Sequence, residues 1–200
     1  MLSADETYAS LFGAWRLMFG KTDGLRLLDL SADGFWNSFF AIVVATPALI
    51  VGWVELANEI GDPDDFTGRL GMLARLAIID IGSWVLPLVA LALVARRAGI
   101  GDRLVHYVVA SNWASAIIAW IMLPLALIRL FVPPNDIVGL ISYLMFGLSL
   151  ALTWRMTNAS IGKGAAVGTA VFVGMFIASL LVFFGLQLLL GITIPDGTTS

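Results

Sequence analysis

The stretch ARRAGIGDR, residues 95–103, decides the fold, because it joins two long apolar runs that together occupy residues 70–131. Arg96, Arg97 and Arg103 all fall within this connector. In membrane proteins, short connectors rich in arginine and lysine stay on the cytoplasmic side of the bilayer. The connector therefore predicts a cytoplasmic turn between two membrane-spanning helices.

The overall composition agrees with this interpretation. Of the 200 residues, 60% are hydrophobic and only 12% are charged, and the mean hydropathy is +0.95. A water-soluble domain of this size cannot bury so much apolar surface, so we expect the bilayer to act as the solvent. The net charge of −3 provides no basic surface for nucleic acid, and a chain without cysteine has no disulfide or thiolate metal site. The sequence thus predicts an all-α polytopic membrane helix bundle that does not bind nucleic acid.

Five apolar segments are long enough to cross about 30 Å of hydrocarbon as helices. We predict transmembrane helices at about residues 34–56, 71–95, 104–130, 137–154 and 165–191. Trp36 and Trp53 lie near the two ends of the first span, where indole rings prefer the membrane interface. An acidic loop around Asp62 follows the first span, and a short extracytoplasmic tail, residues 193–200, follows the last. The second and third spans form a hairpin and are expected to pack as neighbours.

Lysine and arginine are distributed unequally between the two sides of this five-span arrangement. Eight lie on one side, namely Arg16, Lys21, Arg26, Arg96, Arg97, Arg103, Arg155 and Lys163. Three lie on the other, namely Arg69, Arg75 and Arg129. The excess marks the cytoplasmic side, so the N-terminus is predicted to be cytoplasmic and the C-terminus extracytoplasmic.

The first 33 residues are predicted to form a cytoplasmic amphipathic helix and a connector. Ser3 and Glu6 have the spacing of a capping box at a helix N-terminus. Apolar residues then recur at helical intervals on one face, namely Tyr8, Leu11, Phe12, Trp15, Met18 and Phe19. We expect this helix to lie in the headgroup plane, because it is too polar to span the bilayer. The alternative is a helix that packs on the protein's own cytoplasmic loops.

Asp80 is the strongest candidate for a functional residue, because a carboxylate inside a membrane span is costly and normally faces other helices, water or a ligand. Ser83 shares its helical face, and the third span adds Ser111, Asn112 and Ser115. We expect these five residues to form an intramembrane polar patch. Two interpretations remain open: a site for a proton, a cation or a polar ligand, or a protonated or hydrogen-bonded Asp80 that holds helices together.

Small residues recur at four-residue spacing in the last two spans. The pairs are Gly147 and Ala151, Gly164 and Gly168, and Gly174 and Ala178. Such faces let helices approach closely, either within the bundle or in a homodimer. The chain has no Ser-His-carboxylate set, paired carboxylates, phosphate-binding glycine loop or zinc-protease motif, so we predict no catalytic residue, metal site or cofactor.

The basic connector continues into the third span as RRAGIGDRLVHYVVAS, residues 96–111, and the last polar turn leads into KGAA, residues 163–166. Together with the amphipathic N-terminal segment and the five spans, this pattern resembles bacterial members of the Yip family, which are relatives of Rab-interacting membrane proteins. The resemblance covers residues 34–185. In that family a polar residue and then a proline follow the basic turn; here Ser111-Asn112-Trp113 follows, and the proline comes at Pro124.

The resemblance implies a non-enzymatic protein of the bacterial inner membrane that organises membranes or binds other membrane proteins. Our first functional hypothesis is therefore a scaffold or an accessory subunit of a larger assembly. The alternatives are a small secondary transporter or channel that uses the polar patch around Asp80, and a lipid-handling protein that accommodates an acyl chain among its spans. In each case the lipid bilayer is the one partner that the composition requires.

Overall fold

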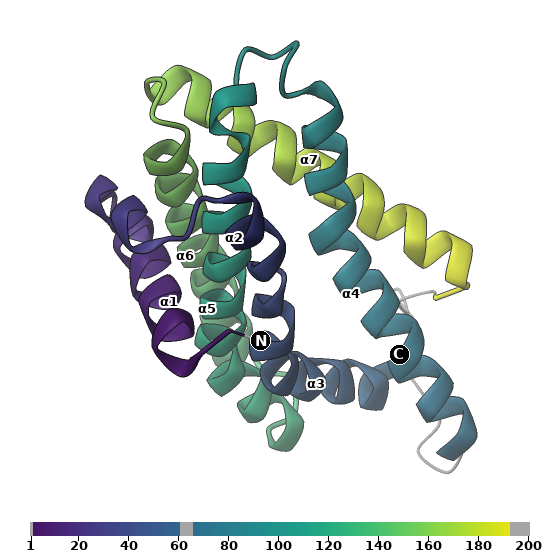
Figure 1. Cartoon of the computed structure of the whole chain (residues 1–200). Coiled ribbons are helices and arrows are strands. Elements are labelled where there is room, and N and C mark those ends of the chain that lie inside the picture. Colours follow the sequence, from purple (N-terminus) through teal and green to yellow (C-terminus); the bar gives the residue numbers. More distant parts are fainter. Residues whose placement is uncertain (1, 61–65, 193–200) are drawn as a thin grey trace.

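A computed structural model describes residues 2–60 and 66–192 of the chain. The acidic loop around Asp62 and the polar tail therefore lie outside the described residues. The elements are α1 (Ala4–Met18), η1 (Thr22–Leu27), α2 (Ala32–Asn37), α3 (Phe40–Ile60), α4 (Phe66–Val94), η2 (Gly101–Arg103), α5 (Leu104–Phe131), α6 (Asp136–Ile161) and α7 (Ala165–Leu190), where η marks a 3-10 helix. Within the described residues, five segments are long and apolar enough to cross a membrane, as the sequence predicts. The chain thus has the all-α architecture of a multi-pass membrane protein (Figure 1).

The first predicted span consists of two helices, α2 and α3, which are separated at Ser38. The Ser38 hydroxyl donates a hydrogen bond to the Phe35 carbonyl oxygen (2.7 Å) where the backbone changes direction. Within α3, Pro47 has no N–H to donate to the preceding turn, and the indole N–H of Trp120 donates to the neighbouring Val44 carbonyl oxygen (2.9 Å). A proline and a side chain that binds the helix backbone are both known causes of bending, and α3 bends partway along its length (Figure 1).

The long helices do not pack in the order of the sequence. α3 packs mainly along α5, α4 packs mainly along α7, and α6 lies against both α5 and α7. The expectation that the second and third spans pack as neighbours is therefore wrong. One reason is the shape of α4: Gly82 has no side chain, and the Leu186 side chain of α7 occupies the space where a Cβ atom would lie (2.6 Å from Leu186 Cδ1).

The two connectors that carry the predicted cytoplasmic charges lie at the same end of the bundle. Lys163, between α6 and α7, donates to the Gly99 carbonyl oxygen (2.7 Å) and forms an ion pair with Asp102 (2.6 Å), both in the connector between α4 and α5. Helix α6 continues to Ile161 rather than ending near residue 154, and Gly162 ends it in the left-handed conformation (φ 60°). The predicted span ended at residue 154 because Arg155 is charged. In the structure Arg155 lies within the helix.

Helix α1 begins at the capping box that the sequence predicts. The Ser3 backbone N–H donates to Glu6 Oε2 (2.7 Å), and the Glu6 backbone N–H donates to Ser3 Oγ (3.2 Å). The hydrogen bond from the Ser3 backbone lowers the pKa of the Glu6 carboxyl group, because it favours the charged form. These hydrogen bonds stabilise the charged N-terminal end of the helix locally.

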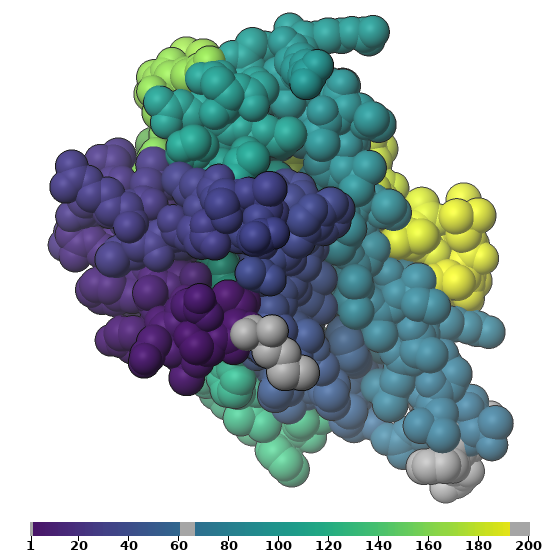
Figure 2. Space-filling view, viewed as in Figure 1, coloured from purple at the N-terminus to yellow at the C-terminus, as the bar shows by residue number. Residues whose placement is uncertain are grey.

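The remainder of α1 is docked on α5 and α6, and it covers one side of the bundle (Figure 2). Its inner face consists of Ser10, Gly13, Ala14, Leu17 and Met18, all of which are buried. Of the predicted apolar face, Met18 and the half-buried Leu11 point inward, whereas Tyr8, Phe12, Trp15 and Phe19 are exposed. The helix therefore packs on α5, on α6 and on the η1 segment of its own connector, where Gly13 approaches Gly24. Its position in the headgroup plane stays a prediction for the four exposed aromatic side chains.

Candidate functional site

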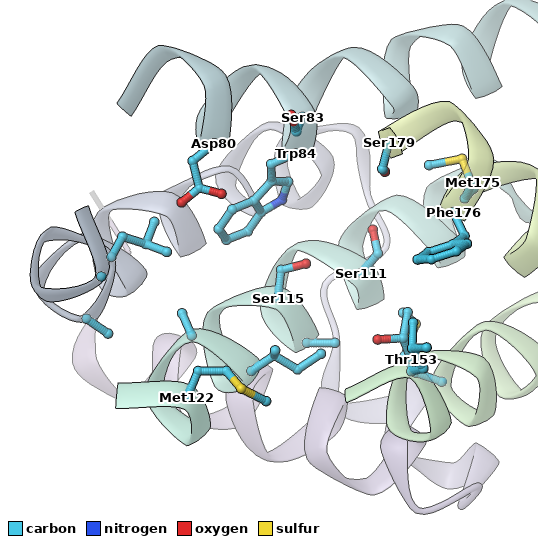
Figure 3. Close-up of a pocket in the computed structure, with 18 of the residues that line it drawn as sticks. Asp80, Ser83, Trp84, Ser111, Ser115, Met122, Thr153, Met175, Phe176 and Ser179 are labelled. Carbon is cyan, nitrogen blue, oxygen red and sulfur yellow. The ribbon is translucent and has the colours of Figure 1, made fainter. Parts of the chain in front are cut away.

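A cavity of about 530 Å³ lies between the five long helices, and every one of them contributes to its wall (Figure 3). Its polar lining includes Asp80 and Ser83 from α4, Tyr107, Ser111 and Ser115 from α5, Thr153 from α6 and Ser179 from α7. Its apolar lining includes Trp53, Trp84, Met122, Met156, Phe172, Met175 and Phe176. Four of the five residues in the predicted polar patch thus face one common space.

Asp80 is the only charged side chain among the described residues that line the cavity. Its Oδ2 atom accepts a hydrogen bond from the indole N–H of Trp53 on α3 (3.0 Å), and no ion pair to Asp80 is found in the described part of the chain. Trp84 follows Asp80 by one helical turn, and its ring lies beside the carboxylate (Figure 3). The carboxylate therefore contacts the Trp53 indole and lies beside the Trp84 ring, without a countercharge from the described residues.

The hydroxyl groups around the cavity differ in what they can offer a ligand. Ser111 donates to the Val108 carbonyl oxygen (3.2 Å), and Thr153 donates to the Ser149 carbonyl oxygen (2.8 Å), so both keep an oxygen that can only accept. The Ser83 hydroxyl oxygen is buried and has no hydrogen-bond partner among the described residues. Ser83 therefore retains both a donor and an acceptor one turn from Asp80.

Asn112 does not line the cavity, although the sequence places it in the same patch. It is fully buried behind the cavity wall, where its Oδ1 accepts from the indole N–H of Trp84 (2.9 Å) and its Nδ2 donates to Ser38 Oγ (2.9 Å). These hydrogen bonds connect α5 to α4 and to the junction between α2 and α3. Asn112 therefore has the contacts of a packing residue, and it fixes the orientation of the Trp84 ring.

Sequence reasoning missed four cavity-lining residues that carry a polar group: the aromatic residues Trp53 and Tyr107, and the hydroxyl residues Thr153 and Ser179. Trp53 was expected at the membrane interface, but its N–H group points at Asp80 inside the bundle. Nothing in the local sequence distinguishes an interfacial tryptophan from one that serves an intramembrane carboxylate. Thr153 and Ser179 belong to the last two spans, and they reach the cavity only because α6 and α7 close it from one side.

An ion pair crosses from α3 to α5 just beyond the cavity, at the predicted extracytoplasmic end. Arg129 lies 3.1 Å from Glu55 and 3.7 Å from Glu59. Glu55 follows the cavity residue Trp53 by two positions, and Arg129 lies one turn beyond the cavity residue Ala126. Arg129 thus faces two carboxylates outside the cavity, and Asp80 remains the only charged side chain among the described residues that line the cavity.

The chemistry of the cavity comes from one carboxylate, several hydroxyl groups, aromatic rings and thioethers. In residues 2–60 and 66–192, no three His, Cys, Asp or Glu side chains are grouped so that they could hold a metal ion. Comparisons of the chain with protein-family models, with curated proteins and with solved structures find no match.

Proposed function

We propose that this chain is a non-enzymatic protein of a bacterial inner membrane that binds a small solute in the cavity beside Asp80, as a small secondary transporter or channel does. The observation that supports this proposal is an apolar-segment carboxylate that lines a cavity and has no countercharge in residues 2–60 and 66–192. Ionisable side chains within membrane spans are expensive, and they typically mark the path of an ion or a solute. We further propose the orientation that the charge count predicts, with a cytoplasmic N-terminus and an extracytoplasmic C-terminus.

The cavity itself favours ligand binding over a purely structural role for Asp80. Its volume of about 530 Å³ lies in the range of about 300–1,000 Å³ that is common for small-molecule sites. A carboxylate that only held helices together would be surrounded by packed side chains, because protein interiors leave few voids larger than a water molecule. Here one Asp80 oxygen is bound by Trp53, and the neighbouring Ser83 hydroxyl is left without a partner.

Cysteine labelling tests this proposal directly, because the native chain contains no cysteine. We expect the Ser115→Cys variant to react with a small water-soluble methanethiosulfonate in membrane vesicles, since Ser115 lines the cavity. The matched control is Ala116→Cys, because Ala116 is the next residue on α5, is fully buried and does not line the cavity. If the two variants react equally slowly while both remain folded, the cavity is closed to water and Asp80 has only a packing role.

A second candidate function is a Yip-like scaffold that binds a second copy or another membrane protein through its small-residue faces. Gly147 on α6 and Gly174 on α7 have no neighbouring atoms within 4 Å of a Cβ position, so this chain leaves both faces unused. Gly168, in contrast, packs against Asn158 within the chain. The faces around Gly147 and Gly174 are therefore better candidates than the Gly168 face for contact with a helix of another protein, and we test Gly147.

For the scaffold candidate, we expect a Gly147→Cys variant to form a disulfide-linked dimer in native membranes under mild oxidation. The matched control is Gly71→Cys, because Gly71 on α4 has equally open surroundings but belongs to none of the small-residue pairs. Non-reducing electrophoresis measures the dimer fraction. Equal dimer fractions for the two variants would count against a specific contact through α6.

A further inference from the structure

Building on the proposed function, we infer that the cavity takes an organic monocation with an apolar or aromatic body. The inference combines three features that meet in one space. They are a single carboxylate, two tryptophans that flank it, and a wall that is apolar over most of its area. Trp53 donates to the Asp80 carboxylate, and the Trp84 ring lies beside it (Figure 3). Each feature excludes a different class of solute.

The charge of the solute follows from Asp80. It is the only charged group among the described residues that line the cavity, and Arg129 is paired with Glu55 and Glu59 outside it. An ionised carboxylate in a low-dielectric interior is stabilised by one positive charge close to it. A bound anion would be repelled, and a dication would bring a second charge that nothing in the cavity wall compensates.

The body of the solute follows from the rest of the wall. Inorganic cations such as Mg²⁺ require several oxygen ligands at short distances, whereas this cavity offers one carboxylate and hydroxyl groups spread over four helices. The faces of indole rings attract organic cations, and methionine side chains adapt to apolar ligands of irregular shape. The lining contains Trp53, Trp84, Phe176, Met122 and Met175, which provide both kinds of surface.

The carboxylate and the rings are held in place before a ligand arrives. The Trp53 N–H donates to Asp80 Oδ2 (3.0 Å), which holds the carboxylate in place at the cavity wall. The Trp84 N–H donates to the buried Asn112 (2.9 Å), so its ring stays beside the carboxylate. Preorganisation of this kind reduces the entropy lost on binding.

The test compares two methanethiosulfonates of similar size on the Ser115→Cys variant in membrane vesicles: the trimethylammonium-ethyl cation and the sulfonato-ethyl anion. Each rate is divided by the rate of the same reagent with 2-mercaptoethanol in solution. We expect the normalised cation rate to exceed the anion rate by about tenfold, because the charge at Asp80 concentrates cations in the cavity. In Ser115→Cys combined with Asp80→Asn, the ratio should fall to about one, and Asp80→Glu should restore it.

The shape preference is tested by protection of the same cysteine. Tetraphenylphosphonium should slow the labelling of Ser115→Cys severalfold when Asp80 is present and should have no effect in the Asp80→Asn background. Tetraphenylborate, which has the same shape and the opposite charge, should not protect. If the two reagents react with equal normalised rates and neither tetraphenyl ion protects, this inference fails while the solute-binding proposal stands. If neither reagent reacts at all, both fail.

Discussion

Replacing Asn112 by alanine lowers the free energy of unfolding by about 2–3 kcal/mol, the cost of removing two buried hydrogen bonds and leaving their partners unsatisfied. Asn112 is fully buried and accepts from Trp84 while it donates to Ser38. After the substitution, the Trp84 N–H has no acceptor in its native position. The Ser38 hydroxyl, at the junction between α2 and α3, also loses the hydrogen bond that it accepts from the Asn112 side chain. Unfolding in mixed micelles with increasing sodium dodecyl sulfate measures the change.

The control for Asn112 is Ser115→Ala on the same helix, because no hydrogen bond of the Ser115 side chain is found in the described structure and Ser115 lines the cavity. Its effect should stay within about 0.5 kcal/mol. Trp84→Phe combined with Asn112→Ala should cost less than the sum of the two single changes, since both remove the same hydrogen bond. A loss below about 0.5 kcal/mol for Asn112→Ala would show that water replaces its partners.

Replacing Gly168 by alanine costs about 2 kcal/mol of stability, because the added methyl group would overlap Asn158 on α6. The new Cβ atom would lie 2.7 Å from Asn158 Cγ and 2.9 Å from Asn158 Cα, and the latter contact involves the backbone. A rotation of the Asn158 side chain cannot relieve it, so α6 and α7 must move apart. Overpacking of this kind typically costs about 1–3 kcal/mol. The same micelle unfolding experiment measures it.

Gly174→Ala is the matched control for Gly168→Ala, because Gly174 lies on the same helix and has nothing within 4 Å of a Cβ position. Alanine is the better helix former by up to about 1 kcal/mol, so this variant should be neutral or more stable. The two alanine variants should therefore differ in sign. If they have the same effect, the close contact of Gly168 with Asn158 does not hold α6 and α7 together.

The sequence predicted which segments form long helices, because length and apolar composition suffice for that. It could not predict their packing partners. In a bilayer every long helix is apolar on most sides, so the contacts are decided by local shape, as where Leu186 fills the space beside Gly82. The short connector between α4 and α5 led us to predict that these two helices pack together. Instead α4 packs with α7 and α3 packs with α5, and no single segment of the sequence predicts these pairings.

The sequence could predict those features of the candidate site that depend on the spacing of residues within a single helix. Asp80 stands out as a charge in an apolar run, and helical spacing alone places Ser83 near it. Asn112 was placed in the same patch because it is polar, but it is turned toward Ser38 and the Trp84 N–H group. Which side of α5 faces the cavity depends on where α2 and α3 dock, and that information is distributed over several segments.

The order in which the helices pair has a consequence for biogenesis. α1 leaves the ribosome before its partners α5 and α6 are made, and α4 is made before its partner α7. During synthesis these earlier segments therefore exist without their final neighbours. The native bundle can close only after translation has passed residue 190, so premature termination within the last helix leaves α4 exposed to lipid and to quality-control proteases.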